Sequence, residues 1–126
     1  MGQRYGGALP SVLATLPGDL IVLLSDQNFV SFGGVPLGNG KLVAGIKNLY
    51  SPPFTYANVP LNVIVHELGH AIGLRHNSDP AALMCGRPAP CRPDLFFSRE
   101  KRIFPLLESD RAALLKLYPP EWRSAP

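Results

Sequence analysis

The sequence predicts a single domain of the α+β class, with two strand-like segments in its first half and two helical segments in its second half. Its 126 residues are enough for one domain with a small core. Short aliphatic runs come first and longer helical periods follow, with proline and glycine concentrated in the connections. We therefore expect one domain over residues 1–118 and a C-terminal tail over residues 119–126.

Two segments are predicted to be strands. Residues 19–25 (DLIVLLS) form a short aliphatic run that is typical of a buried strand, and residues 41–46 (KLVAGI) are the second candidate. Gly45 inside the second segment indicates close approach by another backbone. Gly33-Gly34 and the Gly38–Gly40 turn are predicted to lie in loops.

Two segments are predicted to be helices. Residues 61–74 form the first, with Asn58 as a candidate N-cap and Pro60 near the first turn. Ser109-Asp110 is expected to cap the second helix, Arg111–Leu117. The side chains expected to pack inward are apolar, namely Val63, Ile64, Leu68, Ala71, Ile72, Leu114, Leu115 and Tyr118.

The composition argues against two classes of partner. The net charge is +3, and the basic residues are scattered except for Arg99, Lys101 and Arg102. We interpret that cluster as a solvated loop in preference to a site for an acidic partner. The sequence has no basic stripe with interleaved aromatic residues, so nucleic-acid binding is not expected. No apolar run approaches the ~20 residues of a membrane span, and the first residues do not resemble a signal peptide.

The two cysteines, Cys85 and Cys91, lie in a segment rich in proline and glycine. A disulfide would pin this loop if the protein is exported, because such bonds persist in oxidising compartments. Two free thiols are an equally supported alternative. Zinc binding by this pair is the least supported, since no further ligand of the right type lies nearby.

The most informative segment is HELGHAIGLRH, which contains all three histidines of the chain. The spacing of His66 and His70 places both imidazoles on one helical face. Gly73 lets the chain leave the helix, so that His76 can turn back as a third ligand. Glu67 lies beside the first ligand. Ordinary histidines on a helix are the alternative, but the added glycine and third histidine favour a zinc site with one open position.

The chain resembles the metzincin zinc peptidases, and most closely their matrixin branch. HELGHAIGLRH matches the metzincin zinc motif, and HNSDPAALM resembles the matrixin run to the Met-turn, with Met84 as the Met-turn residue. GDLIVLL and GKLVAGI resemble the central and edge strands, and LESDRAALLKLYP resembles the C-terminal helix. The resemblance covers residues 18–119. It implies a small mixed sheet with an active-site helix and a C-terminal helix.

The resemblance also implies an activity, namely zinc-dependent endopeptidase. One catalytic Zn²⁺ held by His66, His70 and His76 would activate a water molecule, with Glu67 as general base. A peptide or protein substrate would add antiparallel to an edge strand formed by Leu42, Val43, Ala44, Gly45 and Ile46, where Gly45 leaves room. The loop from residue 85 to residue 105 would wall the substrate pocket. Phe96 and Phe97 either line that pocket or, as we favour, seal the lower core.

Three departures from the family limit what it implies. About eighteen residues precede the first strand, which is expected of a minimal or N-terminally shortened member. Ala44 takes the place of a histidine that holds a structural zinc, so no second zinc is expected. Residues 85–88 replace the Pro-x-Tyr segment that normally walls the pocket.

Two further points remain open. The short N-terminal region motivates an alternative function, a catalytically degenerate domain that binds peptides or a partner, and an uncovered sheet face would then suit an oligomer contact. The resemblance favours a secreted or periplasmic protein, although the sequence itself leaves the compartment undecided.

Overall fold

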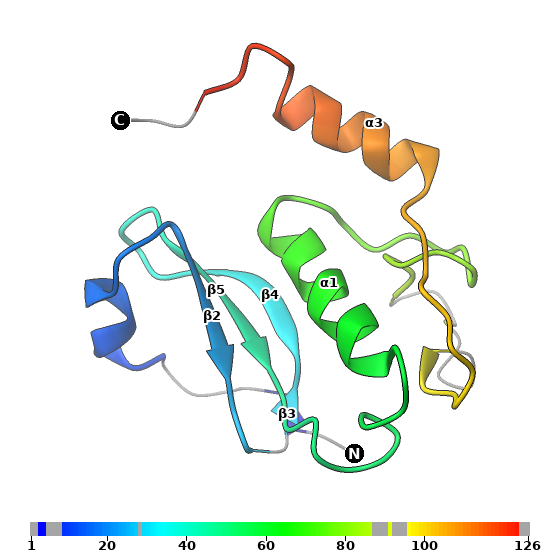
Figure 1. The fold of residues 1–126 in the computed structure, drawn as a ribbon. Helices are drawn as coiled ribbons and strands as arrows, with labels where there is room; N and C mark the ends of the chain where they lie inside the picture. Colours follow the sequence, from blue (N-terminus) through cyan, green and yellow to red (C-terminus); the bar gives the residue numbers. More distant parts are fainter. Residues whose placement is uncertain (1–2, 5–8, 28, 87–90, 92–95, 124–126) are drawn as a thin grey trace.

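The computed structural model describes residues 3–4, 9–27, 29–86, 91 and 96–123, and it has the predicted α+β fold, a small mixed sheet with two helices (Figure 1). Among these residues no helix is long and apolar enough to cross a membrane. The elements, in chain order, are β1 (Gln3–Arg4), the 3-10 helix η1 (Ser11–Thr15), β2 (Leu20–Leu24), β3 (Phe29–Val30), β4 (Phe32–Pro36), β5 (Leu42–Ile46), α1 (Val59–Ala71) and α3 (Glu108–Leu117).

The main sheet has three strands in the order β2-β5-β4. Strand β2 runs parallel to β5 with Val22 opposite Ala44, whereas β4 runs antiparallel to β5 with Val35 opposite Val43. The short strands β1 and β3 form a separate parallel pair. Both predicted strands are therefore confirmed.

The prediction that residues 42–46 form an edge strand is wrong. This segment is β5, the central strand, and it pairs with β2 on one side and with β4 on the other. The edge beside it is β4, which contains the Gly33-Gly34 pair that was predicted to be a loop. A substrate strand therefore cannot add to β5, because its two sides already carry strand partners.

The two glycines of β4 allow this strand to lie directly against α1. A Cβ on Gly33 would come 2.9 Å from the His70 Cβ and would overlap the Glu67 carbonyl. Gly34 has φ of 73°, and its Cβ would lie 3.0 Å from the His70 carbonyl oxygen. The glycines are thus needed for a close approach, and β4 is the strand that lies beside Glu67 and His70.

Gly45 also permits a close contact, although not the one expected. The ring of Phe32, which lies opposite Gly45 on β4, occupies the space that a Cβ on Gly45 would need. The close approach is therefore made by a side chain inside the sheet, and Gly45 leaves no room for an incoming backbone.

The sheet is covered on both faces, but unevenly. On one face Leu13 of η1 packs with Ile21 and Val43. Successive residues of a strand point to opposite faces, so Ala44 and Ile46, which are fully buried, point to the α1 side. Strand β2 extends beyond the helix on that side: Val22 is 45% exposed and Leu24 is 71% exposed. An apolar strip of β2 is therefore uncovered in the described part of the chain.

Helix α1 confirms the first predicted helix with shifted ends. It begins after Asn58 with Pro60 in its first turn, and the cap residue makes no side-chain hydrogen bond. Gly73, with φ of 110°, takes the chain out of the helix as expected. Ile72 is 41% exposed, so the prediction that it packs inward is wrong.

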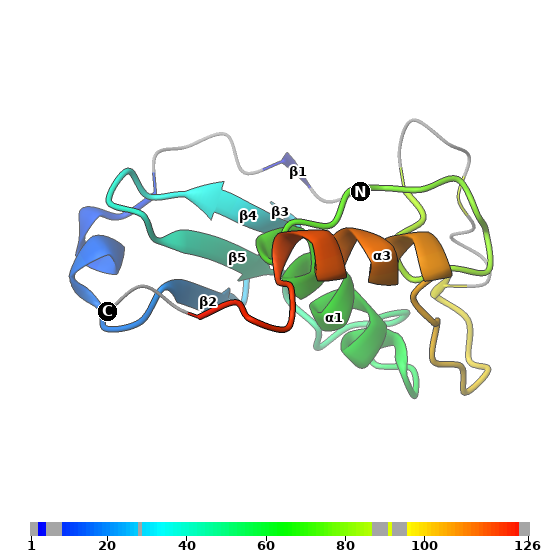
Figure 2. The same ribbon diagram turned by 90° about the horizontal axis from the view of Figure 1, so that it is seen from above.

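Helix α3 lies over the C-terminal part of α1, as the two perpendicular views show (Figures 1 and 2). Its Leu114 packs against the buried cluster of Leu74, Leu83, Met84 and Phe104. Tyr118 donates its hydroxyl hydrogen to the Ile72 carbonyl over 2.8 Å. Leu115 is 61% exposed and is not the inward anchor that was predicted.

Asp110 does not occupy the N-cap position that was predicted for it. The helix starts at Glu108, so Asp110 is the third helical residue, and its carboxylate reaches back to the Leu107 N–H over 2.9 Å. The same oxygen accepts a hydrogen bond from the Asn77 side-chain amide over 3.4 Å. Asp110 is buried and thereby joins α3 to the segment that follows the third histidine.

Replacing Asp110 with Ala is expected to lower the free energy of unfolding by about 1–3 kcal/mol, because the Leu107 N–H and the Asn77 side-chain amide, both partly buried, lose their acceptor. Urea denaturation measures this difference. The neighbouring Ser109→Ala replacement at an exposed position is the matched control and should change stability by less than about 0.5 kcal/mol. Equal effects of the two replacements would contradict this account of Asp110.

Candidate metal centre

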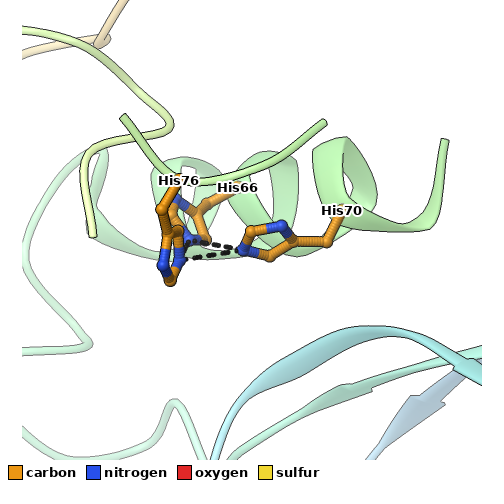
Figure 3. A group of neighbouring side chains, drawn as sticks. All are labelled: His66, His70 and His76. Carbon is orange, nitrogen blue, oxygen red and sulfur yellow. Dashed lines mark hydrogen bonds between the residues drawn. The ribbon is translucent and has the colours of Figure 1, made fainter. Parts of the chain in front are cut away.

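The three histidines of the chain converge on one point (Figure 3). The Nε2 atom of His66 lies 3.2 Å from that of His70 and 3.2 Å from that of His76. The Nε2 atoms of His70 and His76 are 3.0 Å apart. His66 and His70 come from adjacent turns of α1 and are half-buried, whereas His76 comes from the following loop and is exposed.

The outward-facing nitrogens of the two helical histidines are hydrogen-bonded to backbone carbonyls. His66 Nδ1 lies 2.7 Å from the Leu83 oxygen, and His70 Nδ1 lies 2.8 Å from the Leu74 oxygen. A carbonyl only accepts, so each Nδ1 must donate, which leaves the Nε2 lone pair directed at the shared point. Burial lowers the pKa of His70, opposed by the Leu74 carbonyl and aided by the nearby His76. The neutral imidazole that a metal requires is thereby favoured.

The spacing of the donors fits a tetrahedral zinc ion. Zinc–nitrogen bonds of about 2.0–2.1 Å in a tetrahedral arrangement separate the ligand nitrogens by roughly 3.3–3.4 Å. The observed separations of 3.0–3.2 Å differ from this by only a few tenths of an ångström. Three imidazoles are a donor set that suits Zn²⁺. Among the described residues, the three histidines are the group whose ligand atoms lie close enough together to hold a metal ion.

The loop that carries His76 is held by a backbone ladder. The Asn77 N–H donates to the Met84 oxygen over 2.9 Å, and the Gly86 N–H donates to the Asn77 oxygen over 3.1 Å. A Cβ on Gly86 would overlap the imidazole of His76 at three ring atoms. Gly86 is therefore a site residue that the sequence did not reveal, because the need for glycine arises only from this contact.

The cysteines form a disulfide, which decides between the two alternatives that the sequence left open. Cys85 is bonded to Cys91 with a Cα–Cα distance of 5.9 Å. Cys85 is itself buried and immediately precedes Gly86. The covalent link therefore fixes the chain next to the residue on which the His76 ring lies.

Glu67 follows the first histidine on α1 and is only 8% exposed. Burial raises the pKa of its carboxyl group to about 7. A divalent cation bound by the adjacent imidazoles would favour the charged carboxylate. The site thus combines three imidazole donors with the carboxyl group of Glu67, which does not belong to the group of side chains that could hold the ion.

Met84 is fully buried beneath the helix that carries the first two histidines. A Cβ on Gly69 would lie 2.7 Å from the Met84 sulfur, so the thioether packs against the turn just before His70. Met84 belongs to the same cluster as Leu83, whose carbonyl oxygen holds His66. The apolar cluster below α1 is therefore continuous with the backbone group that orients the first histidine.

Phe96 contacts both the core and the first histidine, and Phe97 packs beside it. The Phe96 ring stacks on buried Phe104 at a centroid distance of 5.3 Å and meets the His66 ring edge-on at 6.4 Å. Phe97 contacts Phe96 and Phe54, each at 5.2 Å. Phe96 thus packs on the core, as we favoured, and also reaches the first histidine. Of the loop expected to wall the pocket, residues 87–90 and 92–95 lie outside the described part of the chain.

Zinc is expected to raise the stability of the protein, because the three donors come from a helix and a separate loop and converge only in the folded chain. At a free zinc concentration about 1,000 times Kd the stabilisation would be roughly 4 kcal/mol. Thermal unfolding with a chelator and after zinc is restored measures it. Magnesium, which prefers oxygen ligands, is the control and should leave Tm unchanged. The same Tm with chelator and with zinc would contradict a metal centre.

A family model described as Matrixin matches residues 53–119 of the chain. This span is more than half of the 126-residue chain and contains α1, the three histidines and α3. No solved structure matches the chain.

Proposed function

Because this chain belongs to the matrixin family of peptidases, we propose that it is a zinc-dependent endopeptidase. The convergence of three imidazole nitrogens within 3.2 Å of one another is the observation that carries the proposal. His66, His70 and His76 would hold one catalytic zinc ion. When bound, zinc lowers the pKa of a water molecule to near ~7 and polarises the peptide carbonyl.

Glu67 is proposed as the general base. Its carboxylate would take a proton from the attacking water as the C–O bond forms, and would then pass this proton to the leaving amine nitrogen as the C–N bond breaks. Its burial on α1 beside His66 supports this role, because a carboxylate shielded from solvent is a stronger proton acceptor. Met84 would act as the apolar floor beneath the ligands.

A peptide substrate would add to the edge of β4. Within the described residues strand β4 pairs with β5 on one side only, and it lies against α1 at Glu67 and His70. A strand added antiparallel to β4 would bring its backbone past the catalytic groups, and main-chain hydrogen bonds would hold it there. Its N-terminal residues would lie near Pro36 and its C-terminal residues near Phe32, since β4 runs from Phe32 to Pro36.

The disulfide supports a location outside the cytoplasm. Bonds such as Cys85–Cys91 form and persist in oxidising compartments and are rare in reducing ones. A secreted or periplasmic protein is therefore the proposal that fits both this bond and the family.

The alternative is a binding domain without turnover. The observation that favours it is the apolar strip of β2, where Val22 and Leu24 are exposed in the described part of the chain. Such a strip would suit a partner or a second copy of the chain.

Cleavage of a diverse mixture of unstructured peptides by the zinc-loaded protein distinguishes the two functions. We expect new peptide termini, detected by mass spectrometry, that disappear with a chelator and return with zinc. A protein that holds one zinc ion per chain yet produces no new termini would overturn the peptidase proposal and favour the binding domain.

A further inference from the structure

A row of aromatic rings leads away from the candidate metal centre. It starts where Phe96 meets the His66 ring at 6.4 Å, and it continues through Phe97 to Phe54 with centroid distances of 5.2 Å each. Phe54, Phe96 and Phe97 are each partly exposed. We call these three residues the ring row. It forms a surface that is continuous with the first histidine.

The far end of the ring row carries positive charge. The Lys47 ammonium nitrogen lies 4.2 Å from the centre of the Phe54 ring. Tyr56 lies two residues after Phe54, and the Arg99 guanidinium lies 5.1 Å from the centre of its ring. These two cations thus rest on aromatic rings from the same stretch of chain.

Neither cation is neutralised within the described residues. Among the residues that the structure describes, no carboxylate lies within 4.0 Å of Lys47 or Arg99, whereas the neighbouring Glu100 pairs with Arg102 at 2.8 Å. Burial lowers the pKa of Lys47, so its ammonium group has lost some of its hydration without gaining an acidic partner in the described part of the chain. An acidic group brought to this end of the ring row would offset that loss.

The charged end lies where the C-terminal half of a substrate would point. The Lys47 N–H donates to the Ser31 hydroxyl oxygen over 3.0 Å, and Ser31 directly precedes β4. A strand antiparallel to β4 runs from Pro36 toward Phe32 and therefore leads toward Lys47. The residues after the cleaved bond would thus travel from the metal centre in the direction of this lysine.

We infer that the ring row and Lys47, with Arg99 beside them, bind the substrate residues that follow the cleaved bond. This surface selects an acidic side chain at a position beyond the residue that directly follows the bond. The inference rests on the proposed function and names its substrate class. Successive contacts along the row span 4.2–6.4 Å. An extended chain rises ~3.3 Å per residue, so the acidic residue falls within about six positions of the bond.

The sequence did not indicate this surface for a physical reason. The cluster around Arg99 was interpreted as a solvated loop in preference to a site for an acidic partner. Phe54 and Tyr56 reach it only through folding, from the segment that leads into α1. Cation and ring are brought together by tertiary structure, which no local pattern records.

Matched fluorogenic peptides test the inference. They share a large apolar residue after the bond and carry either Glu or Gln at one of the next five positions. We expect kcat/KM to be higher for the Glu peptide at one position by roughly three- to fivefold, the effect of a partly exposed ion pair. Raising the salt concentration should reduce this ratio, because such a pair is screened.

The Lys47→Met variant removes the charge and keeps an apolar stem against Phe54, so it should bring the Glu/Gln ratio close to one. Lys116→Met removes the same charge from an exposed position on α3 and should leave both activity and the ratio unchanged. Arg99→Met provides a second variant should Lys47→Met fail to fold. A ratio near one in the unmodified protein, or a ratio that survives in Lys47→Met, would overturn the inference.

A binding measurement separates this inference from the proposed function. The same Glu and Gln peptides, labelled with a fluorophore, are titrated with zinc-loaded Glu67→Gln protein and followed by anisotropy. Tighter binding of the Glu peptide that is lost with Lys47→Met supports the surface even when the unmodified protein cleaves nothing, in which case only the peptidase proposal fails. Equal binding of both peptides would overturn the surface, whether or not cleavage occurs.

Discussion

Replacing Glu67 with Gln is expected to lower peptide turnover by about 100-fold or more while zinc binding is retained. The change removes the group that accepts the proton of the attacking water, and general bases typically contribute factors of about 10²–10⁴. Gln has nearly the same shape, so the buried position beside His66 can still be filled. Initial rates on a cleaved peptide and the zinc content per chain measure the two properties separately.

The matched control for this prediction is Glu108→Gln, which removes a carboxylate from an exposed position on α3. It should leave both turnover and zinc content unchanged. A Glu67→Gln protein that keeps more than a tenth of the original rate would show that another group accepts the proton. Loss of zinc together with turnover would instead assign Glu67 a role in forming the centre.

The parts of the fold that were predicted from the sequence depend on local signals. The histidines of α1 are one turn apart, so helical geometry alone places them on one face. The end of this helix follows from Gly73, whose φ of 110° is rarely adopted by other residues. The strands at residues 20–24 and 42–46 are short aliphatic runs, and each was recognised within one or two residues of its bounds.

The parts that could not be predicted depend on contacts between distant segments. Gly33 and Gly34 have low strand propensity and indicate a loop when they are considered alone. The structure places them in β4, where a side chain at Gly33 would overlap α1, and this contact exists only in the folded chain. Missing β4 had a functional consequence, since the central strand was then taken for the edge that would receive the substrate.

The start of α3 likewise combines a local signal with a contact to a distant segment. Asp110 was recognised as a capping residue, but its place in the helix depends on which N–H its carboxylate reaches. Its second partner, Asn77, lies on the loop after His76. The sequence identified the chemical group correctly, whereas the contact with that loop fixed its position.

The third ligand provides the second large effect that we expect. Replacing His76 with Ala removes one of three nitrogens and leaves the two histidines of α1, so the affinity for zinc should fall by more than the roughly 10–100-fold that is typical when only a supporting residue is lost. Competition with a chromophoric chelator measures the dissociation constant. Affinity within tenfold of the unmodified protein would show that His76 does not bind the ion.

Gly86→Ala tests the position of His76 without altering any ligand. The added methyl group would overlap the imidazole ring, and the neighbouring ladder and disulfide restrain both segments, so the ring has to move away from the other two nitrogens. We expect zinc affinity to fall by roughly 10–100-fold, as for the loss of other groups that orient a ligand. The same competition assay measures this change.

Gly38→Ala is the control, because an added Cβ at Gly38 would have no atoms within 4 Å, although the φ of 87° at this position, unlike the backbone at Gly86, disfavours a side chain. It should cost some stability through backbone strain and leave zinc affinity unchanged. If Gly86→Ala binds zinc as tightly as the unmodified protein, the His76 ring must be able to adjust, and its position would then be set by the metal. A selective loss in Gly86→Ala would instead mean that the loop holds the third ligand in place before zinc arrives.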